Sequence, residues 1–157
     1  MPAASAPLPA LPATFRPTRT RVVLLSVGLA MFAVLAVVGL VLERLHPGER
    51  ATFILTGLLF LGVLALLARP HLTADNDGVT VVNLTRTRRL AWAEILRVNL
   101  RYGDPWVFLD LADGTSLAAM GIQPGIDREQ AINDARALRA LAEEHGSGTG
   151  GEPKQQP

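Results

Sequence analysis

The sequence contains no cysteine, and this absence limits the chemistry that the chain can perform. Disulfide bonds and thiolate metal sites are excluded, and the composition agrees with a reducing compartment without requiring one. The three histidines, His46, His71 and His145, show no spacing that suggests a metal site. We therefore expect neither a metal ion nor another cofactor.

Lysine is nearly absent as well: of the 15 lysine and arginine residues, only Lys154 is a lysine. The net charge of +1 hides an uneven distribution along the chain. Residues 71–145 hold eight arginines against eleven acidic residues, so the net charge of this segment is near −3. We do not expect it to present the basic surface that binding of nucleic acid requires.

The motifs of common enzyme classes are also missing. Residues 146–151 spell G-x-G-x-x-G, but they follow a predicted helix, which is the wrong context for a dinucleotide site. No serine lies in a nucleophile-elbow sequence. Residues 75–77 begin like a calcium loop, yet Gly78 comes two positions early and Arg86 replaces the bidentate glutamate. We predict a protein without catalytic activity.

Two long apolar runs are the dominant feature that the sequence does have. Residues 22–42 and 51–68 contain no charged side chain. As helices they would span roughly 31 Å and 27 Å, about the thickness of a hydrocarbon core. Residues 43–50 between them carry four charges and a Pro-Gly turn signal. We predict a transmembrane hairpin over residues 22–68, since the first run is too long for the alternative, a signal peptide.

Arginines flank this hairpin at its outer ends. Arg16, Arg19 and Arg21 precede the first run and Arg69 follows the second, whereas each loop arginine has a glutamate beside it. Arginines near membrane ends mark the cytoplasmic side. We therefore predict a multi-pass protein of the plasma membrane with both termini in the cytoplasm.

Small residues recur at helical spacing in both runs. They let helix backbones approach closely, so we expect them to form seams within the hairpin or between copies of the chain. The candidates are Ser26, Ala30, Ala33, Ala36, Gly39, Thr52, Thr56, Gly62 and Ala65.

The segments outside the hairpin differ in composition. Residues 1–21 are rich in proline, alanine and threonine and are predicted to be a disordered tail. Residues 146–157 are rich in glycine, proline and glutamine and are predicted to be a flexible tail. Residues 69–145 form short alternating segments separated by turn signals, followed by an amphipathic helix that Asp127 caps. This pattern predicts a small α+β domain, an antiparallel β barrel or meander with one C-terminal capping helix.

Specific residues of this domain sharpen the prediction. They are residues 72–75 (LTAD), 77–79 (DGV), 88–95 (RRLAWAEI), 104–106 (DPW) and 109–114 (LDLADG). Together they resemble the bacterial PH-domain family of low molecular weight protein antigen 6, whose members are small actinobacterial membrane proteins with two helices before the domain. The resemblance implies a PH-like barrel and implies no biochemical activity.

Two functional hypotheses follow. The first is a membrane-anchored PH-like module at the cytoplasmic face that binds a protein partner or a second copy; an accessory subunit of a membrane complex has the same sequence signature. The second is a module that senses anionic lipid headgroups through the local basic cluster Arg86, Arg88 and Arg89, each worth ~1 kcal/mol near an anionic leaflet. The cluster also suits a solvated turn, and the acidic turn at residues 75–78 argues against phosphoinositide binding there.

Overall fold

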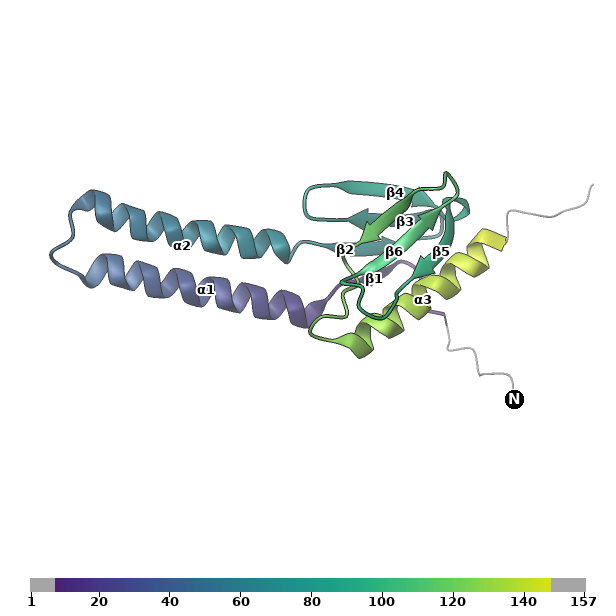
Figure 1. Cartoon of the computed structure of the whole chain (residues 1–157), viewed down its shortest axis with the longest axis horizontal. Coiled ribbons are helices and arrows are strands. Elements are labelled where there is room, and N and C mark those ends of the chain that lie inside the picture. The colour runs from purple at the N-terminus through teal and green to yellow at the C-terminus, as the bar shows by residue number, and fades with distance from the viewer. Residues whose placement is uncertain (1–7, 148–157) are drawn as a thin grey trace, which may run out of the picture. The chain divides into compact units, whose positions relative to one another are not determined.

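The structure is a computed structural model that describes residues 8–147 of the chain (Figure 1). The described residues divide into two compact units. One unit comprises residues 18–69, and the other combines residues 8–17 with residues 70–147. We describe each unit separately.

The first unit is a hairpin of two apolar helices, α1 (Thr18–Val41) and α2 (Pro47–Leu67). Both are long and apolar enough to span a membrane. Each begins four residues before its predicted start, because polar residues occupy the first helical turn. In α2, Pro47 takes the first position, where a missing N–H costs nothing, and the Glu49 carboxylate accepts a 2.8 Å hydrogen bond from the His46 backbone N–H.

The two helices approach each other at three glycines, Gly28, Gly39 and Gly57, which are buried. A Cβ atom added at Gly57 would lie 3.2 Å from the Cα atom of Phe32 on the opposite helix. Of the predicted seam residues, Gly39 lies in the contact within the hairpin, whereas Ser26 and most others are exposed on the single chain. A seam between copies of the chain stays a prediction.

The second unit consists of two antiparallel sheets and one helix. The first sheet has the strand order β1-β2-β3-β4, and the second has the order β5-β6-β7. Its elements are β1 (Ala13–Phe15), β2 (His71–Ala74), β3 (Gly78–Val82), β4 (Thr87–Ala91), the 3₁₀ turn η1 (Trp92–Glu94), β5 (Ile95–Asn99), β6 (Val107–Leu111), β7 (Ser116–Ala119) and α3 (Arg128–Ser147). Two apolar helices followed by a small α+β domain confirm the predicted fold class.

Strand β1 corrects the predicted disordered tail. Residues 13–15 pair antiparallel with β2, and Phe15 lies opposite Leu72. The Phe15 side chain is only 6% exposed and belongs to the core, which also receives part of Leu11. The proline-rich composition gave no signal for this three-residue strand, because its pairing partner β2 lies beyond the helical hairpin in the sequence. Residues 1–7 of the predicted tail lie outside the described residues.

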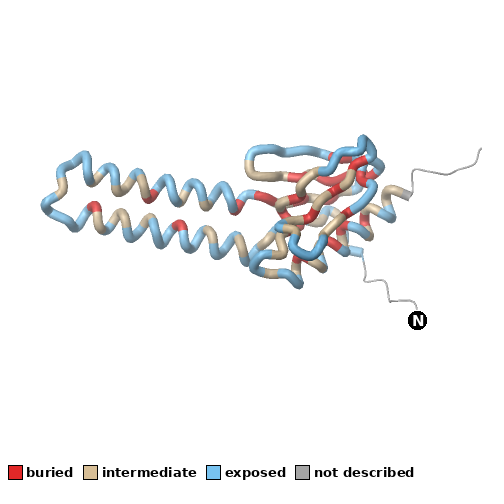
Figure 2. Tube along the Cα trace, viewed as in Figure 1, coloured by how far each residue is buried: buried red, intermediate tan, exposed pale blue. Residues whose placement is uncertain are grey.

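The core lies between the sheets and one face of α3. Buried residues gather on the strands and along that face (Figure 2). The largest fully buried side chains are Leu72, Val79, Val81, Leu90, Val107, Leu109, Ile122, Leu138 and Leu141. Helix α3 continues through Ser147, so the predicted domain end at residue 145 is short by two residues. The rest of the predicted C-terminal tail lies outside the described residues.

Candidate binding surfaces

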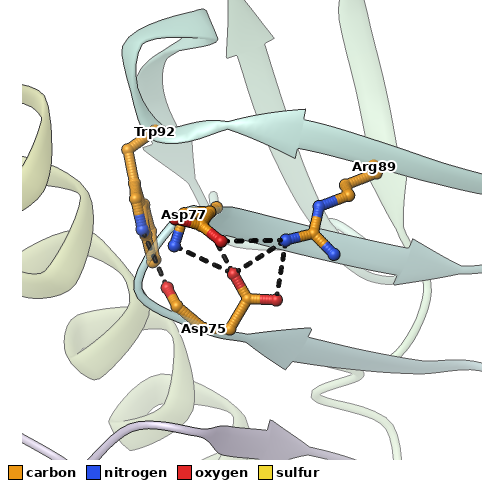
Figure 3. A network of polar contacts seen from close by, with 5 residues as sticks. Asp75, Asp77, Arg89 and Trp92 are labelled. Atoms are coloured by element: carbon orange, nitrogen blue, oxygen red, sulfur yellow. Dashed lines mark hydrogen bonds and ion pairs between the residues drawn. The ribbon is translucent and has the colours of Figure 1, made fainter.

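The β2–β3 turn is held by a compact polar network (Figure 3). The Oδ1 atom of Asp75 accepts hydrogen bonds from the backbone N–H groups of Asp77 and Gly78, each at 3.0 Å. The guanidinium of Arg89 lies 3.1 Å from Asp75 and 3.7 Å from Asp77. Trp92 donates from Nε1 to the Asp75 carbonyl at 3.0 Å. These contacts account for the acidic turn as a structural element.

The predicted basic cluster is divided by the fold. Arg88 and Arg89 are consecutive residues of β4, so their side chains leave opposite faces of the strand. Arg89 pairs with the acidic turn, whereas Arg88 lies 3.7 Å from Asp113 in the β6–β7 turn. The pKa of Asp113 is lowered by hydrogen bonds from the Thr115 side chain and backbone, with a smaller contribution from Arg88.

Arg86 lies in the β3–β4 turn, where its carbonyl accepts a 2.8 Å hydrogen bond from the Asn83 backbone N–H. Its side chain is the one member of the cluster that forms no ion pair with another described residue. Carboxylates therefore lie beside two of the three arginines, and a membrane-facing patch of all three stays a prediction.

A groove lies between β5 and α3 in this unit. Its volume is about 820 Å³, and Leu96, Arg97 and Val98 on one wall face Arg139 and Glu143 on the other. Strand β5 is an edge of the second sheet, so one side of its backbone pairs with no other strand among residues 8–147. Such an edge can pair with an additional extended chain.

The side chains of the groove are suited to contact a ligand. Leu96 is 66% exposed and lies at a β-bulge, where the pairing with β6 shifts between Ile95 and Arg97. Arg97 is exposed, and its side chain forms no hydrogen bond or ion pair with another described residue. Arg139 crosses the groove and donates a 2.7 Å hydrogen bond to the carbonyl oxygen of Val98.

Sequence reasoning missed this groove. The alternation of β5 was visible, but nothing local indicates that β5 is an edge or that α3 lies beside it. Beside the groove, Trp92 is buried and stacks on His145 with ring centroids 5.1 Å apart. Within residues 8–147, no group of three or more histidine or acidic side chains could hold a metal ion.

Comparison with known families agrees with this architecture. Residues 69–141 match the family model described as "Bacterial PH domain". The β-rich unit is a PH-like domain. The match confirms the resemblance that the residue patterns indicated. It does not include β1, which precedes the helical hairpin in the sequence.

Similar proteins occur in mycobacteria. The chain is 34% identical over 85 residues to "Uncharacterized protein Rv1417" of Mycobacterium tuberculosis and to "Uncharacterized protein Mb1452" of Mycobacterium bovis. The aligned region covers 54% of this chain and 54% of each relative, so the chain spans about half the length of the curated relatives it matches. No solved structure matches the chain. These names assign no activity to the PH-like domain.

Proposed function

We propose that the chain is a membrane-anchored, non-catalytic interaction module that binds an extended segment of a partner protein in the groove between β5 and α3. Helices α1 and α2 are its membrane anchor. The observation that carries the proposal is the position of β5 at the edge of its sheet, where it forms one wall of a groove of about 820 Å³.

The surface of the helical hairpin supports the membrane anchor. At 1.5 Å per residue, α1 and α2 are about 36 Å and 32 Å long, sufficient to cross a hydrocarbon core. Large apolar side chains along both helices are exposed, such as Leu59 at 67%. A contiguous apolar surface of this size is unfavourable in water and favourable in lipid.

We place both termini in the cytoplasm of a plasma-membrane protein. The support is the distribution of arginine, with Arg16, Arg19 and Arg21 before or at the start of α1 and Arg69 after α2. An alkaline-phosphatase fusion tests this placement: it should be inactive after residue 157 and active when inserted between α1 and α2. Activity at residue 157 would reverse the assignment.

The groove favours a partner segment of defined chemistry. Arg97 and Arg139 outnumber Glu143 on its walls, and Leu96 adds an exposed apolar contact. We expect an extended segment that carries an acidic side chain for Arg97 beside an apolar one for Leu96. Main-chain hydrogen bonds to the edge would supply affinity, and these two side chains would supply specificity.

The alternative, binding of anionic lipid headgroups through Arg86, Arg88 and Arg89, has less support. Two of the three arginines have a carboxylate beside them, which would repel an anionic headgroup even though such exposed ion pairs contribute little to folding stability. A headgroup phosphate would have to displace Asp113 or Asp75, or to bind Arg86 alone. Binding to a membrane complex as an accessory subunit is a special case of the protein-partner proposal.

Site-specific photocrosslinking tests the groove. A benzophenone amino acid would replace Leu96 in the full chain in its native membrane, and Thr87, exposed on edge strand β4, would be the control position. We expect a protein adduct from position 96 and none from position 87. In the same background, Arg97→Glu should lower the yield of the adduct and Arg97→Lys should preserve it.

Three other outcomes would contradict this proposal. Equal yields from the two positions would indicate collision without a specific site. An adduct of twice the mass of the chain would assign the groove to a second copy. An adduct with lipid alone would favour the headgroup hypothesis.

A further inference from the structure

We propose that one end of the PH-like domain docks on the bilayer surface through Tyr102, Ile126 and Arg128. This inference rests on the membrane anchor proposed above and concerns a surface separate from the β5–α3 groove. The docking surface comprises the β5–β6 loop and the segment that leads from β7 into the first turn of α3.

The three side chains form an exposed amphipathic surface. Tyr102 is 89% exposed and Ile126 is 52% exposed, although both are hydrophobic enough to be buried in an ordinary core. The guanidinium carbon of Arg128 lies 4.8 Å from the centroid of the Tyr102 ring, a cation–π contact. A concave region of about 480 Å³ lies beside them, lined in part by Pro105 and Pro124.

This surface lies at the end of the domain where the chain leaves for α1 and returns from α2. The Gln130 side chain, in the same helical turn as Arg128, donates a 3.1 Å hydrogen bond to the carbonyl oxygen of Arg16. A Cβ atom added at Gly121 would lie only 2.6 Å from the Cα atom of His71. The β7–α3 segment therefore lies against the residues that connect the sheet to both helices.

The connections themselves are short. Two residues separate Phe15 from the start of α1, and three residues separate the end of α2 from His71. Fully extended, they span on the order of 10–15 Å. For any orientation of the two units, this end of the domain stays within reach of the ends of the helices.

The chemistry of the surface fits the interface between headgroups and acyl chains. Tyrosine concentrates at membrane interfaces because it combines an apolar ring with a polar tip, and arginine extends its guanidinium to phosphate while its stem stays in apolar surroundings. Acidic residues lie in the same segments as the arginines: Asp104 accepts a hydrogen bond from the Arg101 backbone N–H, and Asp127 precedes Arg128 and caps α3. We therefore expect docking on zwitterionic as well as anionic bilayers.

Spin labelling of the full chain tests the inference, because the absence of native cysteine allows single labels. Three variants would be reconstituted in phosphatidylcholine vesicles, with and without phosphatidylglycerol. Ile126→Cys reports the proposed docking surface, Asn76→Cys reports the exposed turn at the other end of β2, and Val34→Cys reports the middle of α1. Collision with oxygen and with a water-soluble nickel complex then measures the environment of each label.

We expect the label at position 34 to be shielded from nickel, the label at position 76 to be fully accessible, and the label at position 126 to lose most of its nickel accessibility in both lipid mixtures. Adding Tyr102→Ser to the Ile126→Cys variant should restore that accessibility, whereas the control substitution Thr87→Ser should not. Equal nickel accessibility at positions 126 and 76, with position 34 shielded, would overturn docking and leave the anchor intact. Aqueous accessibility at position 34 would overturn the anchor and the docking with it.

Discussion

Arg139 of α3 donates a 2.7 Å hydrogen bond to the backbone carbonyl of Val98 on the open edge of β5. The bond satisfies one outward-facing carbonyl of an edge strand and ties the edge to the helix that covers the core. Proteins commonly protect strand edges by such coverage, because an uncovered edge pairs with other chains. Arg139 therefore occupies one main-chain acceptor of β5, and the rest of this edge is left for the proposed partner segment.

Replacing Arg139 with alanine should lower the free energy of unfolding of the PH-like domain by about 1–3 kcal/mol, the range for a hydrogen bond from a charged donor. The matched control is Arg136→Ala, an exposed position of the same helix, which should change stability by no more than about 0.5 kcal/mol. Denaturant titration of the full chain in detergent, followed by near-ultraviolet circular dichroism of the tryptophans, measures both. Equal effects of the two variants would show that the bond contributes nothing.

Phe15→Ala should destabilise the domain by about 3–5 kcal/mol, because a large core side chain is removed. Thr14→Ala alters the neighbouring exposed position of β1 and serves as the control. The same titration compares them. If Phe15→Ala were as mild as Thr14→Ala, β1 would not be an integral strand of the sheet.

The β2–β3 turn should depend on its backbone hydrogen bonds more than on its ion pairs. Asp75→Ala removes the acceptor of two backbone N–H groups and should cost about 1–2 kcal/mol. Arg89→Gln removes only exposed ion pairs and should cost less than about 1 kcal/mol. The reverse order in thermal unfolding would mean that electrostatics holds the turn.

The fold could be predicted from the sequence where the signal is local. The apolar runs, the tight turns and the apolar stripe of α3 each follow from short-range patterns, and their number and order specified the fold class. Strand β1 could not be found this way, since Phe15 gains its partner only across more than fifty intervening residues. The groove could not be predicted for the same reason: whether β5 is an edge strand depends on which other strands pair with it, and the local sequence does not show that.

The same limit explains the basic cluster. Arg86, Arg88 and Arg89 are adjacent in sequence, so they suggested a patch, but strand alternation separates two of them. The carboxylates that pair with them come from turns elsewhere in the domain, at Asp75 and Asp113. The sequence shows the cluster of positive charges, but only the fold shows which carboxylates lie beside them.

The stability of the domain should respond to the carboxyl group of Asp134. Burial raises its pKa, and the negative charge of Asp127 adds to the increase, while a hydrogen bond from Gln130 opposes it. The folded state thus holds the proton more firmly than the unfolded chain. The resulting stabilisation is complete below the ordinary carboxyl pKa of about 4 and is lost as pH rises through the elevated folded value.

Asp134→Asn should therefore increase stability relative to the native chain more at pH 7 than at pH 4. Glu129→Gln, an exposed substitution in the first turn of α3, is the control for a general change in charge. Denaturant titrations at the two pH values give the difference. A constant offset between Asp134→Asn and the native chain would contradict a burial penalty.

Contact between α1 and α2 should be sensitive to substitution at Gly57 and insensitive at Gly62. An isoleucine at Gly57 would collide with the backbone of Phe32 and should cost about 1–3 kcal/mol, whereas a Cβ at Gly62 would have no described atom of α1 within 4 Å. Disulfide crosslinking between cysteines placed on the two helices reports their approach in membranes. Comparable loss of crosslinking from both variants would place the contact elsewhere.

The pairing of Phe15 with Leu72 also constrains the order in which the domain can fold during synthesis. The ribosome releases β1 before the two helices and β2 after them, so the first sheet must wait for the whole hairpin to be synthesised. In the proposed membrane topology, β1 and β2 can meet only when both lie on the same side of the bilayer. In a chain that crossed the bilayer only once, β1 and β2 would lie on opposite sides, and Phe15 could not pack against the core of the domain. In the proposed topology, the first sheet can therefore form only when the chain crosses the bilayer an even number of times between β1 and β2.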